Sequence, residues 1–325
     1  MTKIIFFQLA IVNCAINYFW NLIWNLRSPR KVDSRVISVG NIAVGGTGKT
    51  SLVEYIASEL KEDRAKIAVV ARGYKRPSSS SPVVCDSDSY DWKTCGDEAA
   101  ALAKSLSGIK IYVNRSKTDG AIKASGDGNK VIIIDDGFQH RKLYRDLDIV
   151  CINGDNPFGN GMLLPSGILR EPVRALKRAD AFVIFSDEDC DISQIKLPEG
   201  KPVFCAKKII AGIMASNNVS IDLKGRKVIG FCGLANPDSF HNTLKSAGAN
   251  IMQFIKFKDH YIFNDNDIAK LRKAIENSDA EFGVTTLKDY VKLERIWPDD
   301  GKLCYIKIKL AIENDAEFIR LLKDE

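Results

Sequence analysis

The sequence predicts an α/β protein in which helices cover both faces of a mostly parallel sheet, followed by a second, smaller α/β domain. Short, continuously apolar runs alternate with helix-like segments, and these runs lack the period-two pattern of strands with one exposed face. Strands that are apolar on both faces lie buried between helical layers, as in a parallel sheet with helical crossovers. A glycine-rich segment after the first of these strands indicates the edge of the sheet at which ligands bind.

Composition is that of an ordinary globular protein with room for two domains. The chain has 325 residues, of which 45% are hydrophobic and 27% charged. Its net charge of +6 is spread along the chain, so we expect no nucleic-acid partner, whereas an anionic substrate or a membrane surface agrees with this charge. The eight cysteines are scattered without paired metal-binding spacing, which predicts reduced thiols in a cytosolic compartment.

Residues 1–31 form a separate N-terminal segment that is almost continuously apolar and aromatic from Ile4 to Leu26. Its polar residues are mainly asparagines spaced by four, which on a helix make one narrow polar stripe; they are Asn13, Asn17, Asn21 and Asn25. Basic residues flank the segment on both sides. We therefore predict a membrane-associated helix.

Three placements of this helix remain open. A helix lying in the membrane interface is favoured by the amide stripe, the aromatic residues and the basic flanks. The segment is also long enough to span a bilayer, and it could instead pack into the protein core. A cleaved signal peptide is disfavoured because no small-residue cleavage site follows the apolar run. Each of the three placements leaves the rest of the chain in the cytoplasm.

The first domain is predicted over residues 32–200. Its helices include Thr50–Leu60 and Asp97–Leu106. Its strands are Arg35–Val39, Ile67–Ala71, Ile109–Val113, Val131–Ile134, Ile149–Ile152 and Ala181–Phe185.

Residues 201–225, which follow a weakly patterned stretch from Asp187 to Gly200, are predicted to link this domain to a smaller one over residues 226–325. Alternation of strands and helices resumes there. The expected strands are Val228–Cys232, Ile251–Phe257, Phe282–Thr285 and Leu303–Ile308, and the expected helices are Pro237–Ser246, Asp265–Ile275 and Asn314–Leu322.

A phosphate-binding loop lies between the first strand and the first helix of the core domain. Gly40 to Ser51 is rich in glycine and ends in Gly48-Lys49-Thr50, so the core is predicted to be an α/β/α sandwich like those of P-loop NTPases. Backbone N–H groups would surround phosphates, the lysine would reach the terminal phosphates, and the threonine hydroxyl would bind Mg²⁺. The residues expected to bind nucleotide are Ala43, Val44, Gly45, Gly46, Thr47, Gly48, Lys49, Thr50 and Ser51.

Two carboxylates, Asp135 and Asp136, end the apolar strand Val131–Ile134. This arrangement puts acids beside a metal ion next to a phosphate loop, so both are candidate Mg²⁺ ligands. Alone, such a pair before a glycine is often only a turn.

Further polar groups cluster after these carboxylates. Gln139, His140 and Arg141 follow directly, and a long loop from Phe158 to Pro172 contains the pair Arg170-Glu171. Ordered loops of this length often have a binding or catalytic role. The alternative for Glu171 is a helix-capping role with Arg170 solvated.

Taken together, these motifs resemble the tetraacyldisaccharide 4′-kinases. The matching motifs occur in the family's order over most of the chain. They are Val39-Gly-Asn-Ile-Ala-Val-Gly-Gly-Thr-Gly-Lys-Thr50, Ala71-Arg-Gly-Tyr74, Gly96-Asp-Glu98, Asp135-Asp-Gly-Phe-Gln-His140, Arg145-Asp146, Phe158-Gly-Asn-Gly161, Leu164-Pro165, Arg170-Glu171, Asn236-Pro237, Phe257-Lys-Asp-His260 and Lys288-Asp289.

The resemblance implies ATP-dependent phosphorylation, with Mg²⁺, of the 4′-hydroxyl of a tetraacylated glucosamine disaccharide 1-phosphate, giving lipid IVA. It also implies two α/β/α domains joined by a β-ribbon, and peripheral or monotopic attachment to the cytoplasmic face of the bacterial inner membrane. The expected partners are the glycolipid substrate and the lipid surface.

The family's catalytic base maps onto Asp97, and its supporting histidine onto His260 in the second domain. A sugar hydroxyl is a weak nucleophile that needs an acceptor for its proton. An Asp-His pair can hold the carboxylate in orientation and relay the proton. Taken alone, Asp97 would be read as a helix N-cap. The chain departs from the family at Ala99, where proline is usual, and at Leu287, where glutamate is common, which leaves the role of the Lys288 segment open.

Several further site residues are expected. Lys49 is counted with Asp97 and His260 as catalytic, and Glu171 joins Thr50, Asp135 and Asp136 as a candidate metal ligand. Arg115 matches a basic position of the family that could contact nucleotide or lipid phosphate. Candidates for the substrate side are Asn41, Arg72, Gln139, His140 and Arg170.

Three rival functions agree less well with the sequence. A GTPase switch lacks the guanine-selecting Asn-Lys-x-Asp pattern. A membrane-anchored ATPase would need no base at Asp97 and would hydrolyse ATP without a lipid acceptor. A soluble metabolite kinase leaves the aromatic N-terminal segment unexplained.

Overall fold

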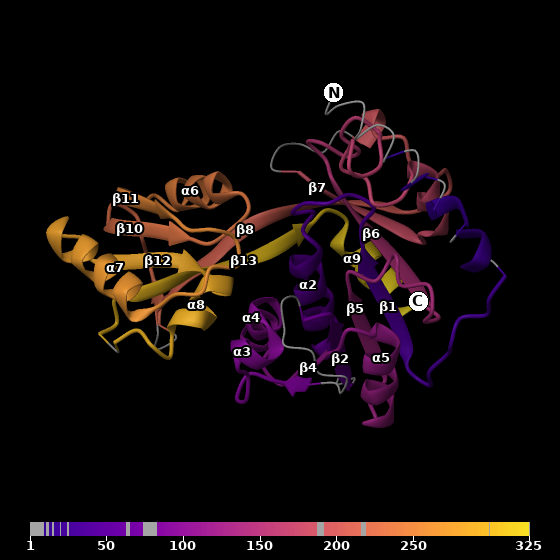
Figure 1. Ribbon diagram of the computed structural model, residues 1–325, viewed down its shortest axis with the longest axis horizontal. Coiled ribbons are helices and arrows are strands. Elements are labelled where there is room, and N and C mark those ends of the chain that lie inside the picture. The colour runs from indigo at the N-terminus through magenta and orange to yellow at the C-terminus, as the bar shows by residue number, and fades with distance from the viewer. Residues whose placement is uncertain are drawn as a thin grey trace.

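The computed structural model describes residues 10, 13–14, 16–19, 21–24, 26–62, 66–73, 83–186, 192–215, 219–298 and 300–324. Two lobes lie side by side and are joined by two long strands (Figure 1).

The first lobe contains most of the N-terminal half of the chain. Its strands are β1 (Arg35–Gly40), β2 (Ile67–Ala71), β3 (Val83–Cys85), β4 (Lys110–Val113), β5 (Val131–Asp135), β6 (Leu147–Asn153) and β7 (Ala181–Phe185). Its helices are α2 (Lys49–Glu62), α3 (Trp92–Cys95), α4 (Asp97–Ser105) and α5 (Lys117–Gly126), with the 3₁₀ helices η1 (Val173–Arg178) and η2 (Ile192–Gln194).

The second lobe and the connection to it follow. The strands are β8 (Val203–Ala215), β9 (Ser220–Ile221), β10 (Lys227–Cys232), β11 (Asn250–Lys256), β12 (Phe282–Thr286) and β13 (Leu303–Ile312). The helices are α6 (Pro237–Ser246), α7 (Asp265–Asn277), α8 (Leu287–Leu293) and α9 (Asp315–Lys323).

One sheet runs through both lobes in the order β11-β10-β12-β13-β8-β7-β6-β1-β5-β2-β4-β3, with β9 beside β8. Within each lobe the neighbouring strands are parallel, except for the edge strand β3 and the short β9. Parallel strands need helical crossovers, which here cover both faces. This architecture confirms the predicted fold class.

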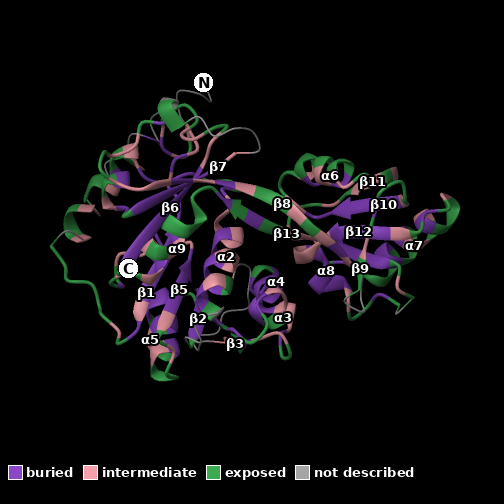
Figure 2. Cartoon of the chain, turned by 180° about the vertical axis from the view of Figure 1, so that it is seen from behind, coloured by how far each residue is buried: buried purple, intermediate pink, exposed green. Residues whose placement is uncertain are grey.

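The connection between the lobes is a ribbon of β8 and β13, which pair antiparallel from Cys304↔Ala215 to Ile312↔Ala206. Residues 201–225, expected as a linker, thus contain β8 and β9. At one end β8 also pairs with β7 of the first lobe, and at the other β13 pairs with β12 of the second. Figure 2 shows exposed and buried residues mixed along the ribbon, in contrast to the buried central strands.

The C-terminal helix α9 returns to the first lobe. Its Phe318 is fully buried and packs against Tyr55 of α2 and Phe204 of β8, with ring centroids 6.0 and 4.9 Å away. Arg35 at the start of β1 donates to the carbonyl of Leu322. The end of the chain therefore completes the core of the lobe in which the chain begins.

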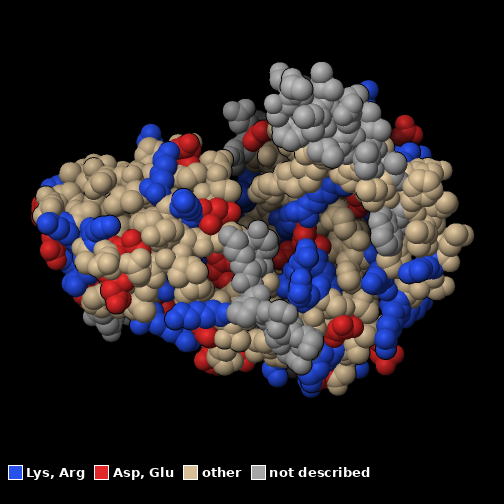
Figure 3. Space-filling model, in the orientation of Figure 1, with Lys and Arg blue, Asp and Glu red and all other residues tan. Residues whose placement is uncertain are grey.

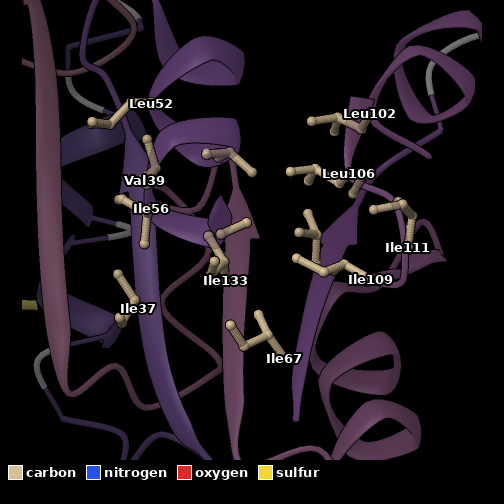
Figure 4. Close-up of a cluster of buried hydrophobic side chains, with 14 of the residues drawn as sticks. Ile37, Val39, Leu52, Ile56, Ile67, Leu102, Leu106, Ile109, Ile111 and Ile133 are labelled. Carbon is tan, nitrogen blue, oxygen red and sulfur yellow. The ribbon is translucent and has the colours of Figure 1, made fainter. Parts of the chain in front are cut away.

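The largest core lies between the sheet of the first lobe and helices α2 and α4 (Figure 4). The strand residues are aliphatic and β-branched, which suits a sheet covered on both faces. The labelled side chains that meet there are Ile37, Val39, Ile67, Ile111 and Ile133 from the strands, Leu52 and Ile56 from α2, Leu102 from α4, and Leu106 and Ile109 from the turn that follows α4.

The N-terminal segment is helical at every described residue from 10 to 24, and it lies on the surface of the first lobe. Its asparagine stripe faces the lobe: the Nδ2 atom of Asn13 donates to the carbonyl of Leu164 at 2.8 Å. Several of its described apolar residues are exposed, with Phe19 at 62%, whereas Ala10 is buried. Asn25 lies outside the described residues. No described helix is long and apolar enough to cross a membrane.

The cysteines largely, but not wholly, match the expectation of reduced thiols. Six described cysteines are free, and all but Cys14 are buried. Cys205 in β8 is disulfide-bonded, so the prediction that all eight are reduced is wrong at this residue.

We expect Ile133→Ala to lower the free energy of unfolding by about 3 kcal/mol, because it removes buried methylenes from the central strand and leaves a cavity. Ile133 has 0% of its surface exposed. The matched control is Ile209→Ala on β8, where the side chain is 46% exposed and the expected loss is below about 1 kcal/mol. Urea denaturation followed by circular dichroism measures both. Equal losses would contradict the assignment of the core to this sheet.

Candidate active site

The candidate site is built at the carboxyl ends of the central parallel strands. Strands β1 and β5 are neighbours, with Val39 opposite Asp135, so the segments that follow them start side by side. Figure 3 shows Lys and Arg side chains around a hollow over α2, with acidic side chains among them. The hollow lies where the topology predicts a ligand site.

The phosphate loop connects β1 to α2, and the first turn of α2 begins at Lys49 with Thr50 and Ser51 half-buried. Gly45 and Gly48 adopt φ values of +118° and +77°, which residues other than glycine rarely adopt. A Cβ atom on Gly48 would also lie 2.4 Å from the ring of Phe185. This conformation of the loop therefore requires glycine at position 48.

The side chain of Asn41 forms hydrogen bonds inside this loop. It is fully buried, and its Nδ2 atom donates to the carbonyl of Ala43 at 2.6 Å and to the hydroxyl of Thr47 at 2.8 Å. Gln139 donates in turn to the carbonyl of Asn41 at 2.7 Å. In this structure the two residues expected on the substrate side thus hold the loop that precedes α2.

The long loop ending at Pro172 lies against the phosphate loop. The backbone N–H of Val44 donates to the carbonyl of Ile168 at 2.8 Å, and that of Arg170 donates to Ile42 at 2.7 Å. The pair Arg170-Glu171 is thereby held next to the glycine-rich segment.

Asp136 is surrounded by cations. Arg170 donates to both carboxylate oxygens at 3.0 Å, and the Nζ atom of Lys49 lies 3.6 Å from Oδ1. Although burial alone raises the pKa of Asp136, the charges of Lys49, Lys117 and Arg170 outweigh burial, and the pKa lies below its usual range. The carboxylate is therefore ionised at neutral pH.

Asp135 is the last residue of β5 and is only 9% exposed. Burial, with the nearby charge of Glu98, raises its pKa to about 6. Its Oδ1 atom has no hydrogen-bond partner among the residues that the structure describes. A buried carboxylate oxygen without a described partner, in the residue before Asp136 and near Lys49, suits Mg²⁺, which binds oxygen ligands while keeping several waters.

Glu171 is buried, and its carboxylate is bound by Arg178, whose Nη2 atom lies 3.0 Å from Oε1 and 2.9 Å from Oε2. In the described part of the chain no three His, Cys, Asp or Glu side chains form a ready metal cluster. The metal set with Thr50, Asp135, Asp136 and Glu171 stays a prediction.

Asp97 and His260 come together across the two lobes. Asp97 begins α4 directly after Gly96, whose φ is +91°, and is 6% exposed. His260 lies in the turn between β11 and α7 with φ +59°, and its Nδ1 atom is 2.9 Å from Oδ2 and 3.1 Å from Oδ1 of Asp97. The packing of α4 against α8 supports this contact. A carboxylate and an imidazole expected to cooperate are thus in hydrogen-bond contact.

Lys288 determines which nitrogen of His260 carries the proton. Its Nζ atom lies 3.2 Å from Nε2. Since an ammonium group only donates, Nε2 must accept, and Nδ1–H then donates to Asp97. The carboxylates of Asp259 and Glu98 lie 3.7 and 3.5 Å from the same Nζ atom and hold the lysine in this position. Lys288 was part of a sequence motif, but its role was not predicted.

A buried ion pair lies behind this contact. Lys292 is 2% exposed; its Nζ atom is 2.7 Å from Oδ1 of Asp289 and 3.7 Å from Oδ2 of Asp97, and it donates to the carbonyl of Tyr261 at 2.8 Å. Asp289 accepts in addition from the backbone N–H of Gly233. The pair fixes the turn that carries the histidine. Its residues lie one helical turn apart, a spacing too common to single them out from sequence.

The remaining predicted residues line the same edge. The ring of His140 bonds the hydroxyl of Thr118 at 2.9 Å, and burial, with the charge of Lys117, lowers its pKa to about 4, so this imidazole is neutral. Arg72 and Arg115 are exposed after β2 and β4. Lys117, which donates to the backbone carbonyl of Asp136, was missed because no motif surrounds it.

Comparisons with known proteins agree with this geometry. A sequence model described as tetraacyldisaccharide-1-P 4′-kinase matches residues 6–325. A tetraacyldisaccharide 4′-kinase from Halothermothrix orenii is 38% identical over 90% of this chain and 84% of its own length. Its counterpart from Aquifex aeolicus is 36% identical over 90% and 89%.

A solved structure is similar over the whole chain. The crystal structure of LpxK from Aquifex aeolicus in complex with ATP superposes with a TM-score of 0.84 and 30% identity, covering 100% of this chain and 99% of the other.

We expect Lys288→Met to change the tautomer equilibrium of His260, because Nε2 then loses the group that donates a hydrogen bond to it. In the variant the Nε2–H form becomes populated, and phosphoryl transfer falls about tenfold or more, since an imidazole in the wrong tautomer cannot orient its carboxylate partner. Nitrogen NMR of ¹⁵N-histidine-labelled protein measures this directly, because the chain has only three histidines. Lys288→Arg retains a donor and should retain the wild-type spectrum. An unchanged signal in the methionine variant would refute the assignment.

Proposed function

The chain belongs to the tetraacyldisaccharide-1-P 4′-kinase family, and on that premise we propose how its residues perform the reaction. The protein is a kinase that uses ATP to phosphorylate the 4′-hydroxyl of tetraacyldisaccharide 1-phosphate in lipid A biosynthesis. The family match over residues 6–325 is the observation that carries this conclusion.

On the nucleotide side, the backbone N–H groups of the phosphate loop bind the phosphates of ATP, and Lys49 reaches the terminal ones. Mg²⁺ would be held by Thr50 and Asp135, with Asp136 and Glu171, and supplies charge neutralisation when bound. Arg170 pairs with Asp136 at 3.0 Å and so keeps this carboxylate directed at Lys49. Arg115 and Arg72, exposed at the same edge, are proposed to bind phosphate groups of the nucleotide or the lipid.

On the acceptor side, Asp97 takes the proton of the 4′-hydroxyl as its oxygen attacks the γ-phosphorus. The Oδ1 atom of Asp97 is the accepting oxygen that we propose, because Oδ2 is nearer both to His260 Nδ1 and to Lys292. His260 does not take the proton onward in this state, since its Nδ1 already carries one and Lys288 occupies Nε2. Its role is to hold the carboxylate in place.

The two members of this pair come from different lobes, so the contact requires the lobes to lie together. We propose that their closure completes the site and excludes water, which limits hydrolysis of ATP in the absence of lipid. The ribbon of β8 and β13 is the connection about which such movement would occur.

The N-terminal helix is proposed to place the enzyme on the cytoplasmic face of the bacterial inner membrane. Its outward side carries Ile16, Tyr18, Phe19, Leu22 and Ile23, all more than a third exposed. Apolar residues exposed in this number mark a binding surface. Basic residues follow the helix directly, which suits anionic lipid headgroups. The acyl chains of the glycolipid substrate lie in the same membrane.

The kinase and its base are tested together by transfer of label from γ-labelled ATP to purified lipid A disaccharide 1-phosphate in detergent. We expect labelled lipid from the wild type and a loss of about 10²- to 10⁴-fold in Asp97→Ala, the range typical of a lost general base. His260→Ala should also lower the rate, and an unchanged rate would refute the need for closure.

The control is Asp88→Ala, an exposed carboxylate in the segment before α3, which should retain wild-type transfer. Hydrolysis of ATP without labelled lipid in the wild type would favour a membrane-anchored ATPase instead.

Membrane attachment is tested by sedimentation with vesicles of anionic and zwitterionic phospholipids. The double variant Phe19→Ser, Leu22→Ser should bind at least about tenfold more weakly, because inserting each side chain contributes about 1.5–3 kcal/mol. Ile262→Ser is the matched control, since Ile262 is 65% exposed in the second lobe. Equal binding by all three proteins would exclude the helix face as the attachment surface.

A further inference from the structure

The asparagine stripe of the N-terminal helix leads directly into the active centre. The Nδ2 atom of Asn17 donates to Oδ1 of Asn13 at 3.0 Å, and that of Asn21 donates to the backbone carbonyl of Asn17 at 2.8 Å, so each amide bonds the residue one turn earlier. The last described member, Asn21, turns its side-chain oxygen toward two arginines. Membrane attachment alone requires no such contact.

Two guanidinium groups converge on this single amide oxygen. Nη1 of Arg141 lies 3.0 Å and Nη1 of Arg178 lies 3.3 Å from Oδ1 of Asn21. Burial, followed by the neighbouring charge of Arg178, lowers the pKa of Arg141. A neutral oxygen that accepts from both allows two like charges to remain side by side.

Arg178 divides its two terminal nitrogens between the helix and the site. While Nη1 donates to Asn21, Nη2 binds both oxygens of Glu171, at 3.0 and 2.9 Å. The guanidinium plane also lies 4.4 Å from the centroid of the buried Phe138 ring. These three contacts fix the position of the group.

Glu171 is continuous with the nucleotide side of the site. Its neighbour Arg170 pairs with Asp136, which lies 3.6 Å from Lys49. Because Glu171 directly follows Arg170 in the chain, a movement of the segment that carries Glu171 also reaches the arginine that pairs with Asp136.

We propose that Asn21 is a positioning residue for the metal side of the active centre, acting through Arg178 on Glu171. Asn21 holds Nη1 of Arg178, so that only Nη2 engages the carboxylate. Arg178 thus already contacts both oxygens of Glu171, but through one nitrogen. Without Asn21, Nη1 can join Nη2 on the carboxylate, one nitrogen on each oxygen, and this bidentate pair competes with Mg²⁺ more strongly than the single nitrogen does. The helix is then part of the active centre as well as a membrane surface. This inference rests on the proposed role of Glu171 as a metal ligand.

Binding of Mn²⁺ to the full-length enzyme with ADP, followed by electron paramagnetic resonance in detergent, tests the proposal without turnover. Asn21→Leu should weaken Mn²⁺ binding by about tenfold, the lower end of the effects seen when the hydrogen-bond partner of a metal ligand is removed. Sedimentation with vesicles should be unchanged. Asn21→Asp retains an oxygen for both arginines and should bind Mn²⁺ within about twofold of the wild type.

The matched control is Asn17→Leu, one turn earlier on the same helix, because the described hydrogen bonds of its side chain stay within the helix. It should bind Mn²⁺ like the wild type. Equal loss in the two leucine variants, or none in Asn21→Leu, would overturn the proposal, as would failure of Asn21→Asp to retain binding.

Glu171→Gln distinguishes the proposed metal-ligand role of Glu171 from the positioning role of Asn21. If it leaves Mn²⁺ binding intact, the proposed ligand role of Glu171 fails and the inference falls with it. If it weakens binding while Asn21→Leu does not, the ligand role stands and the inference alone is refuted.

Discussion

The hydrogen bond between Asp97 and His260 is the contact on which the rest of this structure depends. Its partners are 163 residues apart in sequence and lie on different lobes. To form it, α4 must begin at Asp97, which requires the positive φ of Gly96, and the histidine must adopt a positive φ of its own. That strained turn is stabilised by Lys292, which is buried and donates to the carbonyl of Tyr261.

The arrangement also explains why one sheet continues through both lobes. A flexible linker would leave the imidazole free to sample many positions, at a large cost in entropy for each productive contact. The ribbon of β8 and β13 instead pairs with the edge of each lobe, and α9 returns the end of the chain to α2. The two lobes are thus connected by hydrogen-bonded strands, which limits how far one lobe can move relative to the other.

Many charged side chains near the site are held in ion pairs. The chain has 47 lysines and arginines against 41 acids, and many of the cations near the site are already paired. Lys49, Lys117 and Arg170 surround Asp136, while Arg178 neutralises Glu171. Fixed cations of this kind can bind an anionic substrate without reorganising, which is their value in phosphoryl transfer. The N-terminal helix contributes through the neutral oxygen of Asn21, which separates two arginines without adding charge.

Sequence alone determined the features whose signal is local: the continuous apolar strands, the glycine loop from Gly45 to Lys49, and the carboxylates at the end of β5. It also placed Asp97 and His260 through the resemblance to a known family. Tertiary structure decided what depends on distant partners. The amphipathic pattern identified the asparagine stripe but not the direction it faces, since either side of a helix can pack inward. Likewise Lys288 could not be linked to a histidine tautomer, because a hydrogen bond between residues of separate elements leaves no periodic pattern in the chain.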